Sequence, residues 1–138
     1  MTLVNLTPTQ LPVLIIEDDA FMAQLLSFVL KRQGLQVRCV PDGDAALRLL
    51  EGRCDYSAVL LDLLLPRHSG LDVLSRMRQL PDWSLVPVLV LSALDKAEDI
   101  ARAFEAGADD FVTKPFNPDE LLARLKARTN GFTLRGQP

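Results

Sequence analysis

Three short, largely apolar segments of this chain, and one that is half apolar, each run directly into a polar residue that can take part in chemistry. They are 13–16 before Glu17 and Asp18, 58–61 before Asp62, 87–91 before Ser92, and 110–113 before Lys114. Short apolar runs without polar alternation are typical of strands that are buried on both faces of a parallel sheet. This pattern restricts the fold more than any other feature of the sequence.

Segments with apolar residues at helical spacing separate these runs. We expect helices over 21–32, 44–50, 71–77, 95–106 and 118–128, and one further strand over 35–40. Gly34, Gly52 and Gly107 follow three of the helices as stop signals, and Asn117 precedes the last helix as an N-cap. Strands that alternate with helices indicate βα units in a parallel sheet with helices on both faces. The expected fold class is therefore α/β.

The 138 residues are enough for one domain and too few for two ordinary ones. We divide the chain into a leader over 1–10, a single domain over 11–129, and a tail or start of a linker over 130–138. The residues after Arg128 are too few for an output domain. The sequence leaves open whether the chain acts alone or comes from a larger protein.

Composition narrows the function classes. The net charge of −3 argues against direct, non-specific binding of nucleic acid, which needs a basic surface. No apolar run approaches the roughly 18 residues of a membrane span, and no secretory signal is visible, so we expect a cytoplasmic protein. Cys39 and Cys54 have neither CxxC spacing nor clustered histidines, which disfavours a zinc site. Two free thiols are expected, although sequence alone does not exclude one disulfide.

The polar residues at the strand ends form a coherent chemical set. In an open α/β sheet ligands bind outside the carboxyl ends of the strands, so Glu17, Asp18, Asp62, Ser92 and Lys114 should converge there. Three clustered carboxylates repel one another, and Mg2+ is the cation that best relieves this repulsion while accepting phosphate oxygens. The lysine adds positive charge, and the serine hydroxyl can bond to a phosphoryl oxygen.

These groups suit phosphoryl transfer. A carboxylate can act as nucleophile and become an acyl phosphate, while metal and lysine stabilise charge on the equatorial oxygens. No general base is needed, because a carboxylate is already ionised at neutral pH. Taken one at a time, the acids could be helix caps or turn residues, Ser92 a cap, and Lys114 a solvated charge. Their joint placement at the ends of separate strands favours a site.

Four motifs give the chain a resemblance to the receiver domain of bacterial two-component response regulators, from about Val13 to Arg128. The motifs are VLIIEDD at 13–19, VLLDLLLPRHSG at 59–70, VLVLSA at 88–93 and GADDFVTKPF at 107–116. The resemblance implies a flavodoxin-like (βα)5 doubly wound parallel sheet with strand order 2-1-3-4-5. It also implies a cis peptide bond between Lys114 and Pro115.

The resemblance assigns roles residue by residue. Asp62 matches the phosphoacceptor, Glu17 and Asp18 the acidic pair, Leu64 the backbone carbonyl that ligates Mg2+ with them and Asp62, Ser92 the switch hydroxyl, Phe111 the switch aromatic, and Lys114 the lysine of the site. Asp19 lies just beyond the acidic pair and is not expected to be a ligand. Phe111 lacks the phenol that many members carry, so a tyrosine hydroxyl contact to a partner is absent.

The implied function is a signalling switch rather than a turnover enzyme. A sensor histidine kinase or phosphotransfer protein would phosphorylate Asp62, and the new charge would draw Ser92 inward and let Phe111 fill the vacated space. The shifted equilibrium would change the partner surface over 93–128. The charged residues there could pair across a homodimer, or they could be ordinary solvated helix charges: Glu98, Arg102, Asp109, Asp110, Arg124 and Lys126.

Three alternatives remain open on sequence. A flavodoxin-like FMN carrier needs a Ser/Thr/Gly-rich phosphate loop where this chain has acids at 17–19. A haloacid-dehalogenase-type phosphatase needs a second acid where Leu64 stands. A receiver-like interaction module that is never phosphorylated competes most seriously, and the complete set of site residues argues against it.

The residues that flank the acceptor lead to a prediction about phosphoryl lifetime. Leu64 and Leu94 are apolar at positions where polar side chains in some receivers orient the hydrolytic water. We therefore expect slow autodephosphorylation, measured as loss of the phosphoryl group from the labelled chain over time. A lifetime of only seconds would contradict this expectation.

Overall fold

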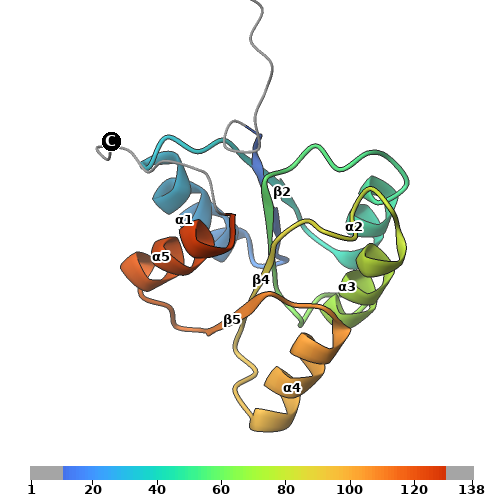
Figure 1. Cartoon of the computed structure of the whole chain (residues 1–138). Helices are drawn as coiled ribbons and strands as arrows, with labels where there is room; N and C mark the ends of the chain where they lie inside the picture. Colours follow the sequence, from blue (N-terminus) through green and yellow to red (C-terminus); the bar gives the residue numbers. More distant parts are fainter. Residues whose placement is uncertain (1–10, 130–138) are drawn as a thin grey trace, which may run out of the picture.

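The computed structural model describes residues 11–129, and the leader and tail predicted from the sequence lie outside the described residues. Five strands alternate with five helices over this range (Figure 1). The elements are β1 Val13–Ile16, α1 Ala20–Lys31, β2 Val37–Val40, α2 Gly43–Leu49, β3 Ala58–Leu61, α3 Gly70–Gln79, β4 Val88–Ser92, α4 Ala97–Ala106, β5 Asp110–Thr113 and α5 Pro118–Thr129.

The strands form one parallel sheet in the order β2-β1-β3-β4-β5, which confirms the expected topology. Figure 1 shows α1 and α5 on one side of the sheet and α2, α3 and α4 on the other. Successive residues of β1 point to opposite faces, so Leu14 and Ile16 enter one core cluster while Val13 and Ile15 enter the other. Both faces of β1, β3 and β4 are buried, which explains why these central strands are apolar, whereas the edge strand β2 is partly exposed.

Local signals set the helix ends. The side chains of Asp19, Asp42 and Ser69 accept hydrogen bonds from backbone N–H groups in the first turns of α1, α2 and α3. Gly34 and Gly107 have φ values of +85° and +116°, a conformation that glycine adopts without a Cβ penalty. The predicted boundaries shift by two residues at two places, because β2 begins at Val37 and α4 begins at Ala97.

Of the apolar residues at helical spacing on α1, Met22, Leu26 and Val29 pack in the core on the sheet as the spacing indicated, and the others do not. Phe21, Leu25 and Phe28 recur at helical spacing, yet the structure leaves them exposed and buries Leu26 and Leu30 against the sheet. Apolar residues surround most of this helix, so periodicity alone does not select the side that packs. An exposed apolar stripe on α1 results.

The remaining expectations concern thiols and membrane spans. Cys39 and Cys54 are both free, and burial raises the pKa of the half-buried Cys54 thiol above its ordinary value. Trp83 is fully buried, and its Nε1 donates to the Gly52 carbonyl at 2.9 Å. Over residues 11–129, none of the helices has the length and apolar character needed to cross a bilayer.

Candidate functional site

The acid cluster lies at the carboxyl edge of the sheet. Glu17 and Asp18 directly follow β1, and Asp62 directly follows its parallel neighbour β3, with Ile16 paired to Leu61. Each of the three acids offers a carboxylate oxygen within 4.8 Å of the others. Glu17 and Asp62 are buried, whereas Asp18 is exposed. The parallel register therefore brings Asp62 to the adjacent pair Glu17 and Asp18, which lies far from it in the sequence.

Lys114 links two of these carboxylates. It follows β5, and its Nζ lies 2.6 Å from Glu17 Oε1 and 3.1 Å from Asp62 Oδ2. Its backbone N–H donates to the Ser92 carbonyl at 2.9 Å, and the following bond to Pro115 is cis, as the resemblance implied. The Lys114 side chain thus reaches from the end of the outer strand β5 to the acid cluster, and the backbone hydrogen bond to β4 holds the residue in place.

Burial affects the pKa values of both Glu17 and Lys114. Burial raises the pKa of Glu17 above its ordinary value, and the hydrogen bonds from Lys114 and the Asp19 backbone only partly offset this effect. Burial alone would lower the pKa of Lys114, but hydrogen bonds to Glu17 and then Asp62 outweigh it, so the pKa is raised. Lys114 stays charged. Its single positive charge lies against the two buried carboxylates of Glu17 and Asp62, so it does not also balance the negative charge of Asp18. The cluster is short of positive charge.

The loop after Asp62 wraps closely around the acceptor. The Leu64 backbone N–H donates to Asp62 Oδ1 at 3.0 Å. A Cβ on Gly70 would lie 2.3 Å from the Asp62 carbonyl oxygen, so the start of α3 can approach Asp62 only because residue 70 is glycine. The role of the Leu64 carbonyl as a metal ligand stays a prediction.

The two predicted switch residues lie on β4 and β5. Ser92 is fully buried at the end of β4, and its Oγ accepts a hydrogen bond from the Leu94 backbone N–H at 3.4 Å. Phe111 is 8% exposed and packs in the core cluster on the α2–α3–α4 side of the sheet. In this structure, therefore, the aromatic ring already lies in the core.

Sequence reasoning missed two supports of the site. Asp19 caps α1 through its carboxylate. Its backbone N–H also donates to Glu17 Oε2 at 3.2 Å, so Asp19 helps to position the acid pair that precedes it. The Nε2 of His68 lies 2.9 Å from Asp44 Oδ1, and Arg67 pairs with the same carboxylate. Asp44, the acid in the first turn of α2, was the sequence feature that could have indicated this contact.

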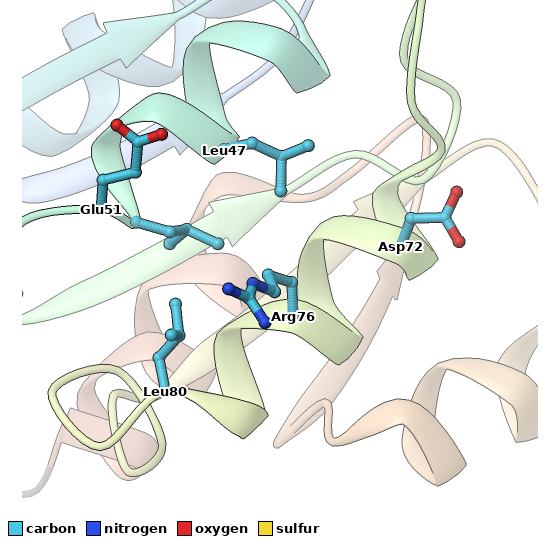
Figure 2. A pocket seen from close by; sticks show the side chains of 6 residues that line it. Leu47, Glu51, Asp72, Arg76 and Leu80 are labelled. Atoms are coloured by element: carbon cyan, nitrogen blue, oxygen red, sulfur yellow. The ribbon is translucent and has the colours of Figure 1, made fainter.

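The largest group of converging acids and the hollow between α2 and α3 lie at different places in the domain. The hollow has a volume of about 610 Å³, and the Arg76 side chain reaches across it (Figure 2). Its lining residues are Leu47, Leu50, Glu51, Asp72, Arg76 and Leu80. None of these belongs to the acid cluster, and no polar groups from separate strands converge there.

Comparison with known proteins decides the family. The model of the response regulator receiver domain matches residues 13–126. The chain belongs to this family. The regulatory protein TcrA of Mycobacterium tuberculosis is 43% identical over 83% of this chain and 44% of its own length, and the sensory transduction protein RegX3 of the same organism is 44% identical over 83% and 49%. The receiver domain thus spans about half the length of the curated relatives it matches.

Solved receiver structures agree with this assignment. A response regulator from Chloroflexus aurantiacus superposes with a TM-score of 0.82 at 34% identity, covering 88% of this chain and 99% of that one. The receiver domain of a sensor histidine kinase from Pseudomonas aeruginosa, solved with magnesium in its active-site cleft, gives a TM-score of 0.80 at 29% identity over 88% and 99%. The donor set here, three close carboxylates with one lysine, fits the same ion.

Magnesium binding gives the first test of the site. Mg2+ should stabilise the folded domain by about 2.7 kcal/mol at a hundredfold excess over its dissociation constant, because the unfolded chain holds no such cluster. Thermal unfolding with and without Mg2+ measures this gain. Asp18→Asn should abolish it.

The matched control is the neighbouring acid. Asn caps a helix about as well as Asp, so Asp19→Asn should keep both the α1 cap and the Mg2+ response. An equal loss of the response in both variants would show that the acidic character of the segment, and not the Asp18 ligand, is responsible.

Proposed function

We propose that Asp62 accepts a phosphoryl group and that Mg2+ held by Glu17, Asp18, Asp62 and the Leu64 carbonyl assists the reaction. The observation that carries this proposal is the placement of Lys114 Nζ against two buried carboxylates of a three-acid cluster. Such a cluster is costly to assemble in a purely structural role, because burial and mutual repulsion both oppose its charge. A bound cation supplies positive charge for the phosphoryl oxygens and for the acids.

The step balances with the groups present. An Asp62 carboxylate oxygen forms the new O–P bond while the P–N bond of a phosphohistidine breaks, and the electron pair of that bond stays on the imidazole nitrogen, which takes up a proton from water. Lys114 then has a phosphoryl oxygen available as a partner beside Asp62, and the Leu64 N–H orients the acceptor carboxylate. Ser92 supplies a hydroxyl for another phosphoryl oxygen once it turns from the Leu94 N–H.

The partners follow from the family. Family membership implies a histidine kinase as phosphodonor, and we propose either that kinase or a phosphotransfer protein for this chain. The domain switches a surface and does not turn over a separate substrate. The two free thiols support a reducing, cytoplasmic location, which cell fractionation would test. We propose that this domain does not itself bind nucleic acid, because a net charge of −3 disfavours it.

Phosphorylation is tested with acetyl phosphate and Mg2+, reading intact mass. The wild-type chain should gain one phosphoryl group in a Mg2+-dependent way, and Asp62→Asn should gain none, because an amide is not a nucleophile at neutral pH. Asp55→Asn is the matched control, since that aspartate is exposed and pairs only at the surface with Arg53. No gain under conditions that label another receiver would favour the interaction module that is never phosphorylated.

A homodimer through the α4-β5-α5 face completes the proposal. Arg124 and Arg128 pair with Asp110 within the chain, at 2.7 and 3.6 Å, and half-exposed Phe104 adds apolar surface. We expect phosphorylation to raise the mass measured by light scattering towards that of a dimer, and Arg124→Glu to oppose this rise. A phosphorylated chain that stays monomeric at all concentrations would exclude the dimer.

A further inference from the structure

The loop that follows the acceptor, residues 63–69, packs against the start of α2. A Cβ on Gly43 would lie 2.6 Å from His68 Cβ and 2.9 Å from the His68 carbonyl oxygen, so glycine at position 43 permits this close approach. The Gly43 backbone N–H also donates to the Pro66 carbonyl through a long hydrogen bond of 3.5 Å. The loop therefore lies within reach of Asp44, the next residue of α2.

Asp44 contacts two consecutive residues of this loop. Its Oδ1 lies 2.9 Å from His68 Nε2, and its Oδ2 lies 3.4 Å from Arg67 Nη1, so each carboxylate oxygen has its own partner. We call these two the Asp44 contacts. All three side chains are partly exposed, and each contact taken alone is therefore weak. Together they fix two adjacent residues to one point on α2.

The backbone of Arg67 needs such a support. Its φ is +76°, and within the described range 11–129 it is the only residue other than glycine with a positive φ. Residues with a Cβ rarely adopt this left-handed conformation, because the Cβ approaches the backbone too closely. An unfavourable backbone conformation persists where the surrounding contacts hold it. The Asp44 contacts act on Arg67 itself and on His68 beside it.

The same loop surrounds the acceptor. The Leu64 N–H donates to Asp62 Oδ1 at 3.0 Å, and the carbonyl of Leu64 is the proposed metal ligand. Leu63 is buried and Leu65 packs on the same core cluster, while the Gly70 N–H donates to the Leu63 carbonyl at 2.9 Å. The first half of the loop is thus held by apolar packing and the second half by the Asp44 contacts. The direction of the Leu64 carbonyl between them depends on both halves.

We propose that Asp44, Arg67 and His68 are positioning residues that direct the Leu64 carbonyl towards the acid cluster, so that contacts outside the cluster set its affinity for Mg2+. This inference rests on the proposed function, in which that carbonyl and the three acids hold the ion. The three residues act through the backbone of the loop and not on the ion itself.

Isothermal titration of the full chain with Mg2+ tests the proposal. Asp44→Ala should raise the dissociation constant for Mg2+ roughly threefold or more, because it removes both contacts at once. Asp72→Ala is the matched control. Asp72 also lies in the first turn of a helix, but its side chain lines the hollow between α2 and α3 (Figure 2). The control removes the same charge and should leave the affinity unchanged. Equal losses in the two variants would show that net charge sets the affinity, and would overturn the proposal.

Combined variants distinguish positioning from a general loss of stability. His68→Ala should weaken Mg2+ binding, and adding it to Asp44→Ala should cause no further loss, because both changes remove the same contact. His68→Gln should keep the affinity close to that of wild type, since a glutamine amide can donate to Asp44. Arg67→Gly should restore most of the affinity in Asp44→Ala, because glycine adopts a positive φ without support. Additive losses, or no recovery with Arg67→Gly, overturn the proposal.

Hydrogen exchange without Mg2+ tests the Asp44 contacts independently of the proposed function. The amides of Leu64 and Gly70 donate within the loop, and they should exchange roughly threefold or more faster in Asp44→Ala than in wild type or Asp72→Ala. Unchanged exchange in Asp44→Ala overturns the positioning role. A wild-type chain that binds no Mg2+ overturns the proposed function instead, and the exchange rates still decide whether Asp44 holds the loop.

Discussion

The contact of one lysine with two buried carboxylates is the interaction on which the rest of the site depends. Lys114 Nζ lies within 3.1 Å of oxygens of both Glu17 and Asp62. Without the lysine, two buried negative charges would lie close together with little solvent around them. The raised pKa of Glu17 indicates that the lysine does not fully compensate them. A cation bound at this cluster, as proposed above, would relieve the same shortage of positive charge.

The sheet makes this contact geometrically available. Parallel strands all deliver their carboxyl ends to one edge, and the order β2-β1-β3-β4-β5 places β3 beside β1 and β4 between β3 and β5. Asp62 therefore adjoins the acid pair directly, whereas Lys114 must extend past β4, which also carries Ser92. The switch serine lies between the acceptor and the lysine because of strand order alone.

The two edges of the sheet have different physical characters. At the carboxyl edge, charged groups lie close together, Ser92 is held by one long hydrogen bond, and the loop to α4 is exposed. At the opposite edge, Arg78 satisfies several carbonyls and Trp83 is buried with its Nε1 bonded to Gly52.

The sequence by itself determined the strand–helix alternation, the parallel sheet and the five residues at its carboxyl edge, because period, length and strand ends are local properties. The resemblance added strand order and the cis bond at Lys114. Only the tertiary structure decided which side of α1 is buried, that Asp44 holds His68, and that Arg78 bonds to the Gly107 carbonyl. These depend on which surfaces meet across long sequence separations, and an apolar or charged residue carries the same local signal whether its partner is solvent or a distant segment.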